Sequence, residues 1–259
     1  MKLLFDIGNT RIKWACDTGS ELLHPGELVH RGLTPEQAVT FITEFEPELN
    51  VESAWAINVA GAELEHALAQ ALELRFGLEL QVARTAKRCG EVINGYTAIE
   101  QLGADRWAAI VGAWKHFQRS VCVVDVGTAV TVDVVAANGG HQGGIILPGL
   151  VLMTESLNRD TSAIEGFSSE SHEYIPGDDW FGRDTLSAVQ SGAVFALRSV
   201  ICQAVKQISE QDGAAPLVVL TGGDAKALLP LADFEADFAV ELMPMLVLEG
   251  LSYLTVENE

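Results

Sequence analysis

Basic residues and cysteines are both scarce in this sequence. Its 259 residues include 16 Lys and Arg against 36 Asp and Glu, a formal net charge of −20. Nucleic acids and anionic lipids are bound largely through Lys and Arg that neutralise phosphate, so we expect neither a nucleic acid nor a membrane as a partner. The four cysteines, Cys16, Cys89, Cys122 and Cys202, form no C-x-x-C pair. This spacing favours a reducing compartment and argues against a structural zinc site.

Long apolar runs are also absent. No uncharged apolar run reaches 18 residues, and the apolar N-terminal segment meets Asp6 after five residues. A membrane span and a signal peptide both need more than this, so we expect a cytoplasmic protein. With 48% hydrophobic and 20% charged residues, the composition is that of a globular chain with a sizeable core.

Several common catalytic motifs are missing. No two of the 24 glycines have the spacing G-x-G, and no Gly-Lys dipeptide occurs, so the dinucleotide fingerprint and the P-loop are excluded. There is no G-x-S-x-G or H-E-x-x-H string, and the six histidines lack ligand spacing. Hydride transfer, P-loop chemistry and zinc hydrolysis therefore lose support.

A duplicated strand-turn-strand pattern is the clearest feature that is present. An apolar strand over 3–5 leads into the turn at 6–10 and an alternating strand over 11–16. Near the middle of the chain, an apolar strand over 121–124 likewise leads into a turn at 125–128 and an alternating strand over 129–134. The first Asp of each turn, Asp6 and Asp125, lie 119 positions apart. We therefore predict two related lobes, residues 1–118 and 119–259.

Further helices and strands fill both lobes in mixed α/β fashion. Helices are expected over 34–45, 62–76, 103–117, 185–209 and 246–254, and strands over 53–59, 78–83, 143–147 and 216–221.

The two turns, Asp6-Ile7-Gly8-Asn9-Thr10 and Asp125-Val126-Gly127-Thr128, have the parts of a phosphate and metal site. A carboxylate can hold a hard cation, Gly lets backbone N–H groups approach phosphate oxygens, and Asn or Thr adds a side-chain donor. A plain tight turn uses the same residue types. Two matched copies, each followed by an alternating strand, favour phosphate binding.

These hairpins resemble the phosphate loops of the acetate and sugar kinase, Hsp70 and actin superfamily. Within it, four strings in this order resemble the type III pantothenate kinase family: 6–10, 103–107, 125–128 and 143–149. Residues 181–185 and 190–192 also fit. The resemblance implies two tandem RNase H-like (actin-like ATPase) lobes with an ATP cleft between them. It also implies transfer of the ATP γ-phosphate to the primary hydroxyl of pantothenate, which gives 4′-phosphopantothenate in the first step of coenzyme A synthesis.

By this resemblance Asp105 is the catalytic base, and Arg106 holds the pantothenate carboxylate with two parallel hydrogen bonds. The implied substrate-binding residues are Tyr96, Gly103, Ala104, Asp105, Arg106 and Thr185. Judged from the residues alone, Asp105 could instead be a helix N-terminal acid and Tyr96 a packing side chain. Thr185 or Asp184 could simply cap a helix. The family usually has a proline after this tyrosine, which is missing from 97–100.

The resemblance also implies an ATP site and two cations. The implied ATP-binding residues are Asp6, Ile7, Gly8, Asn9, Thr10, Arg11, Ile12, Lys13 and Thr128. Asp6 would hold Mg²⁺ with ATP, and Asp125 would hold a monovalent cation, K⁺ or NH₄⁺. An exposed strand lysine is the alternative for Lys13. Residues 222–224 match the adenosine-contacting glycines of the superfamily, or form a strand-to-helix turn.

A homodimer with a shared active site is implied as well, because in the family the threonine matching Thr185 reaches substrate at a subunit interface. Apolar residues such as Val194 and Phe195 would suit that interface or the core. Two rival functions stay open. A small sugar kinase of the superfamily would need an insertion after the first phosphate loop. A non-catalytic regulatory accessory protein predicts damage to Asp6, Asp105 or Asp125, all of which are intact.

Overall fold

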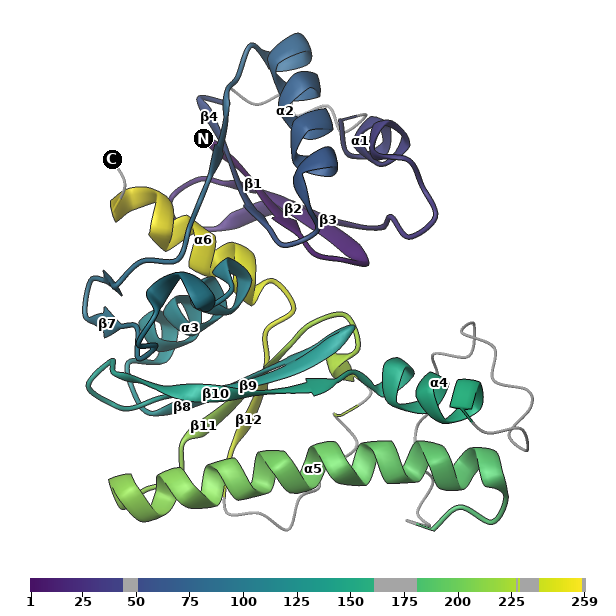
Figure 1. The fold of residues 1–259 in the computed structure, drawn as a ribbon. Coiled ribbons are helices and arrows are strands. Elements are labelled where there is room, and N and C mark those ends of the chain that lie inside the picture. The colour runs from purple at the N-terminus through teal and green to yellow at the C-terminus, as the bar shows by residue number, and fades with distance from the viewer. Residues whose placement is uncertain (44–50, 161–180, 227, 229–237, 258–259) are drawn as a thin grey trace. The chain divides into compact units, whose positions relative to one another are not determined.

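The computed structural model describes residues 1–259 except 44–50, 161–180, 227, 229–237 and 258–259. The chain forms two compact units (Figure 1). Unit 1 consists of residues 1–117, 139–141 and 245–259, and unit 2 of residues 118–138 and 142–244. The last helix and a short stretch at 139–141 therefore pack with the N-terminal residues.

The sheet of unit 1 has five strands in the order β3-β2-β1-β4-β5. Strand β1 pairs antiparallel with β2 and parallel with β4, which pairs parallel with β5. Their bounds are β1 (Lys2–Ile7), β2 (Arg11–Asp17), β3 (Leu22–Val29), β4 (Ser53–Asn58) and β5 (Leu80–Val82). The sequence did not predict β3, because Pro25 and Gly26 interrupt it. An edge strand tolerates both, since one side of its backbone needs no ladder partner.

The sheet of unit 2 repeats this topology. Its order is β10-β9-β8-β11-β12, with β8 antiparallel to β9 and parallel to β11, and β11 parallel to β12. The strands are β8 (Val121–Val126), β9 (Ala129–Val135), β10 (His141–Pro148), β11 (Leu217–Thr221) and β12 (Val240–Leu242). The shared order confirms the predicted α/β class with two related sheets.

Helices cover both faces of the first sheet. The pair α1 (Pro35–Thr43) and α2 (Ala62–Phe76) lies on one face, and the pair α3 (Ala104–Phe117) and α6 (Leu246–Glu257) lies on the other (Figure 1). Successive strand residues point to opposite faces. Residues 3–5 of β1 are therefore buried on both faces of the sheet and form a continuous apolar run. Three short elements, β6 (Arg88–Cys89), β7 (Val92–Ile93) and η1 (Ile99–Gln101), lie between β5 and α3.

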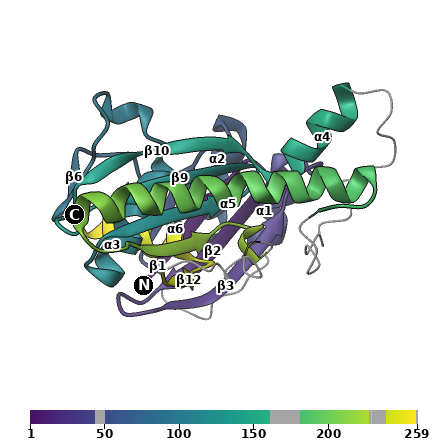
Figure 2. The ribbon, with the colours of Figure 1, turned by 90° about the horizontal axis from the view of Figure 1, so that it is seen from below.

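Helix α5 (Thr185–Asp212) lies along one face of the second sheet, and α4 (Leu150–Asp160) precedes it in the chain (Figure 2). By length and composition α5 could cross a membrane. Its buried face, however, belongs to the core formed with the strands of unit 2. The buried residues are Ser191, Ala193, Val194, Leu197, Ile201, Ala204, Val205 and Ile208. We conclude that α5 is a partly buried core helix.

Close contact between α3 and α6 depends on two glycines. A Cβ atom at Gly250 would overlap the carbonyl oxygen of Ala108, and one at Gly112 would lie 2.9 Å from the carbonyl oxygen of Leu246. We expect Gly250→Ala to push the helices apart and lower the free energy of unfolding by about 1–3 kcal/mol. Urea denaturation would measure this loss.

The same substitution at Gly192 of α5 is the matched control, because nothing lies within 4 Å of a Cβ atom there. Gly192→Ala is expected to leave stability unchanged or raise it by about 0.5–1 kcal/mol. If Gly250→Ala were as stable as Gly192→Ala, the close approach of α3 and α6 would not depend on glycine at position 250.

Candidate active site

The first Asp–Gly hairpin joins β1 to β2 and places a carboxylate and an ammonium group opposite each other. Asp6 and Lys13 are direct cross-strand partners. Lys13 is only 8% exposed, so the alternative of an exposed strand lysine is wrong. A lysine is seldom buried unless its charge is compensated, which makes Lys13 suited to an anionic ligand or to the neighbouring carboxylate.

His30, the residue after β3, forms two hydrogen bonds to the turn of this hairpin. The turn is closed by a 3.0 Å hydrogen bond from the Gly8 N–H to the Arg11 carbonyl. The His30 ring Nε2 donates to the Gly8 carbonyl at 2.8 Å, and the His30 N–H donates to the Thr10 carbonyl at 3.0 Å. The N–H of a trans peptide points opposite to its C=O. The Asn9 N–H therefore points away from the Gly8 carbonyl and from His30.

Three of the predicted ATP-binding side chains make contacts within unit 1 itself. Ile7 and Ile12 are almost fully buried in the core of unit 1, so only their backbone could contact a ligand. Arg11 forms an ion pair with Glu27 on β3. The strand alternation that buries Ile7 and Ile12 leaves Asp6 and Lys13 in register beside them.

In unit 2 two segments that are distant in the sequence pack against the second Asp–Gly hairpin. Gly222, with φ +94, lies so close to Asp125 that a Cβ atom would overlap the Asp125 carboxylate and the Val126 carbonyl. The N–H of Asp224 donates to that same carbonyl at 2.9 Å. The Gly149 N–H donates to the Thr128 carbonyl at 2.9 Å. The glycine loop after β11 and the start of α4 thus both pack against the predicted phosphate loop.

All of the predicted substrate residues except Thr185 lie at the start of α3 or, as Tyr96 does, in contact with it. Arg106 is 6% exposed, and its Nη1 donates to the Tyr96 hydroxyl at 3.0 Å. The Arg106 Cζ lies 5.5 Å from the centre of the Tyr96 ring. Asp105 Oδ1 accepts the Arg106 N–H at 2.7 Å, and a Cβ atom at Gly103 would lie 2.6 Å from this oxygen. The packing around Asp105 therefore depends on the glycine.

Thr185 opens α5 in unit 2 but does not cap it. The cap is Asp184, whose carboxylate accepts the Ser187 N–H at 2.9 Å and the Ser187 hydroxyl at 2.8 Å. The backbone hydrogen bond is the main reason that the pKa of Asp184 lies below its ordinary value, and the bond from the Ser187 hydroxyl adds to it. Because Asp184 is the cap, helix capping does not account for a threonine at position 185. The side chain of Thr185 is exposed.

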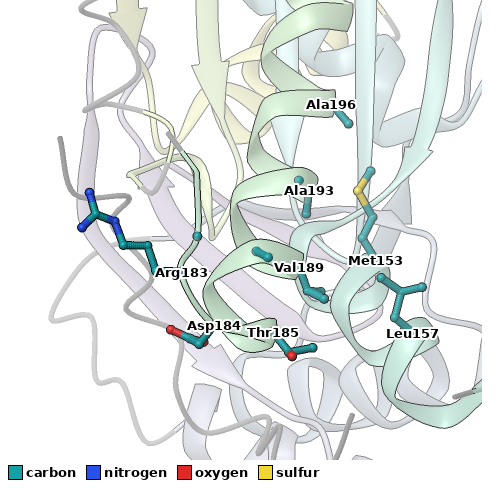
Figure 3. A pocket seen from close by; sticks show the side chains of 11 residues that line it. Met153, Leu157, Arg183, Asp184, Thr185, Val189, Ala193 and Ala196 are labelled. Carbon is teal, nitrogen blue, oxygen red and sulfur yellow. The ribbon is translucent and has the colours of Figure 1, made fainter. Parts of the chain in front are cut away.

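Thr185 borders a cavity of about 880 Å³ between α4 and the first turns of α5. Figure 3 shows the labelled side chains of both helices around this space. It is lined by Met153, Leu157, Gly182, Arg183, Asp184, Thr185, Ala188, Val189, Gly192, Ala193 and Ala196. The lining is mostly apolar, with Arg183, Asp184 and Thr185 as its polar members.

Solved structures of other proteins share this fold. A Campylobacter jejuni protein assigned to the Baf family of transcriptional activators superposes with a TM-score of 0.59 at 23% identity, covering 99% of this chain and 98% of that chain. The activator of 2-hydroxyisocaproyl-CoA dehydratase from Clostridium difficile, solved with bound ADPNP, gives 0.53 at 10% identity, covering 99% and 94%. The paired sheets and twin Asp–Gly hairpins place the chain in the class of actin-like ATPase folds.

The family is shown by sequence. The model of the type III pantothenate kinase family matches residues 2–207. A type III pantothenate kinase from Chromobacterium violaceum is 36% identical over 231 residues, which cover 89% of this chain and 90% of that protein. The chain belongs to the type III pantothenate kinase family, phosphotransferases that phosphorylate pantothenate in coenzyme A synthesis.

Proposed function

We propose that this chain transfers the γ-phosphate of ATP to the primary hydroxyl of pantothenate, with Asp105 as the base and Arg106 as the carboxylate anchor. The observation that carries these assignments is the buried Arg106 guanidinium, hydrogen-bonded to Tyr96 and directly next to Asp105 in the first turn of α3. One helix start thus presents a cation for the substrate carboxylate and a carboxylate for its hydroxyl.

In the proposed reaction Asp105 accepts the hydroxyl proton as the hydroxyl oxygen attacks the γ-phosphorus. The bond from that phosphorus to the β,γ-bridging oxygen breaks, and ADP leaves with the electron pair. The hydrogen bond from the Arg106 N–H to Asp105 Oδ1 orients the carboxylate. A fixed base of this kind reduces the reorganisation needed in the transition state.

Arg106 and Tyr96 would hold the other end of the substrate. A guanidinium binds a carboxylate with two parallel hydrogen bonds, and burial strengthens them. The hydrogen bond to the Tyr96 hydroxyl restrains rotation of the Arg106 side chain. Gly103 and Ala104 directly precede Asp105 in the chain and would contact the substrate through their backbone.

Each of the two hairpins offers groups that would bind phosphate. The turn over Gly8, Asn9 and Thr10 offers backbone N–H groups, and the buried Lys13 offers a positive charge. Thr128 of the second hairpin offers a hydroxyl. Backbone amides of such turns bind anions well, and a nearby lysine compensates phosphate charge as a point charge.

Both proposed cations fit the residues that are present. Among the described residues, no group of three or more His, Cys, Asp or Glu side chains could hold a metal ion. Mg²⁺ that arrives with ATP needs only one or two carboxylates besides phosphate and water, and Asp6 suits this. It would neutralise charge on the transferred phosphate. For K⁺ or NH₄⁺, the Asp125 carboxylate would supply the negative charge, and the Val126 carbonyl oxygen lies on the same side of Gly222.

A homodimer and a cytoplasmic location complete the proposal. Leu157, which lines the cavity near Thr185, is exposed, and two further exposed apolar side chains, Leu186 and Phe195, lie on the same helix as Thr185. A second copy of the chain would cover these residues and bring Thr185 of the partner subunit to the substrate. Light scattering after size-exclusion chromatography would measure the oligomeric state.

The reaction is tested by coupled ADP release with MgATP and pantothenate, with K⁺ present or replaced by Na⁺. We expect turnover that depends on pantothenate and falls when Na⁺ replaces K⁺. A panel of sugars serves as the control acceptors. Turnover with a sugar but not with pantothenate would make the substrate assignment wrong while leaving the kinase class intact. Equal rates in K⁺ and Na⁺ would contradict only the cation assignment.

A further inference from the structure

The tip of the β9–β10 connection is fixed to the segment that leads to Tyr96. Ile93 of β7 donates its N–H to the Gly139 carbonyl at 2.9 Å and bridges to Gly140. Gly139 has φ +82, and a Cβ atom there would lie 2.6 Å from the Glu91 carbonyl oxygen. Only glycine fits this approach. These contacts explain why residues 139–141 belong to unit 1 although the residues on either side belong to unit 2.

His141 follows directly and lies against the Tyr96 ring. The two ring centres are 5.8 Å apart with an interplanar angle of 11°, an offset stacked arrangement. His141 is 4% exposed. Asn94 holds the Tyr96 backbone, because its Oδ1 accepts the Tyr96 N–H at 2.9 Å. The Tyr96 side chain is therefore restrained by a stacked ring as well as by its own backbone.

Tyr96 in turn restrains Arg106. The Arg106 Nη1 donates to the Tyr96 hydroxyl at 3.0 Å, and the guanidinium carbon lies 5.5 Å from the Tyr96 ring centre. His141, Tyr96 and Arg106 thus form a continuous series of contacts. A planar guanidinium binds a carboxylate bidentately only in one orientation, so movement of the Tyr96 ring would misalign it.

We propose that His141 is a positioning residue for pantothenate: its flat ring holds Tyr96, and through Tyr96 the Arg106 guanidinium, in the orientation that binds the substrate carboxylate. This inference rests on the proposed role of Arg106. His141 is not one of the groups proposed to react or to bind ATP, so its loss should weaken pantothenate binding and leave ATP binding unchanged.

Two substitutions distinguish the effect of the flat His141 ring from the effect of its polar atoms. His141→Phe keeps a flat ring and loses the ring nitrogens, whereas His141→Gln keeps polar atoms and loses the ring. We expect His141→Gln to raise the KM for pantothenate about 3- to 10-fold, the size expected for a lost aromatic pair, with the KM for ATP within about twofold of wild type. His141→Phe should stay within about twofold for both substrates.

Steady-state kinetics with each substrate varied in turn measure these values, and thermal melts check folding. The inference is overturned if the two variants show the reverse order, if both equal wild type, or if the KM values for ATP and pantothenate rise together.

Tyr96→Leu removes the other ring of the stacked pair and should also raise only the KM for pantothenate. An unchanged KM for pantothenate in this variant would equally overturn the inference, even if a His141 variant does not fold. Wild-type protein without pantothenate-dependent turnover would instead contradict the proposed function.

Discussion

Asp105→Asn is expected to lower kcat by about 10²- to 10⁴-fold, the range that a positioned general base contributes. Asn has the same shape as Asp and can still accept the Arg106 N–H through its amide oxygen, but it cannot take up the hydroxyl proton. The affinity for pantothenate should stay within a few-fold of wild type, because the Arg106 and Tyr96 contact does not require the charge of residue 105. Coupled ADP release measures kcat, and calorimetry measures binding.

Glu100→Gln is the matched control for this variant. It makes the same chemical change on an exposed side chain of η1, just before the helix that carries Asp105. We expect it to leave kcat unchanged within about twofold. A comparable loss in both variants would show that the net charge of this segment, rather than a base at residue 105, limits the rate.

Arg106→Lys is expected to raise the KM for pantothenate about 10- to 100-fold, equal to about 1.4–2.8 kcal/mol and in the range of hydrogen bonds to charged groups. A lysine keeps the charge but has no planar fork for two parallel hydrogen bonds. It would also lose the geometry of the 3.0 Å contact with Tyr96. The KM for ATP should change little, because the proposed partner of Arg106 is the pantothenate carboxylate and not a phosphate of ATP.

The exposed Arg88 of β6 provides the control. Arg88→Lys should leave both KM values unchanged, and thermal melts of the two variants would separate lost binding from lost stability. If Arg106→Lys bound pantothenate as well as wild type while remaining folded, the carboxylate would have to be held elsewhere.

Local patterns carried most of the prediction. The two Asp–Gly hairpins were predictable because a turn, its glycine and an alternating strand are encoded within about 12 consecutive residues. Helix α2 was predicted with its observed bounds, and α5 to within a few residues, because helices signal themselves through caps and 3.6-residue periodicity. Strand β3 was missed, because Pro25 and Gly26 favour a turn when the neighbouring strand is unknown.

The contacts between distant parts of the chain were not predictable in the same way. His30 lies 22 positions after Gly8, and nothing in the sequence around it indicates that its ring supports the turn. His141 lies 45 positions after Tyr96, in a stretch where histidine spacing suggested no ligand site. The residues around Lys13 fit an exposed strand position as well as a binding site, and only the folded sheet shows that Lys13 is buried.

By itself, the sequence determined the α/β class, the duplicated hairpins and the family, since each depends on residue order along one or a few short segments. The division into lobes 1–118 and 119–259 stays a prediction. Only the tertiary structure decided that α6 packs on α3 in unit 1, that Ile7 and Ile12 belong to the core, and that His141 stacks on Tyr96. The reason is that burial and side-chain contact depend on which elements meet in space, and chain order alone does not specify that.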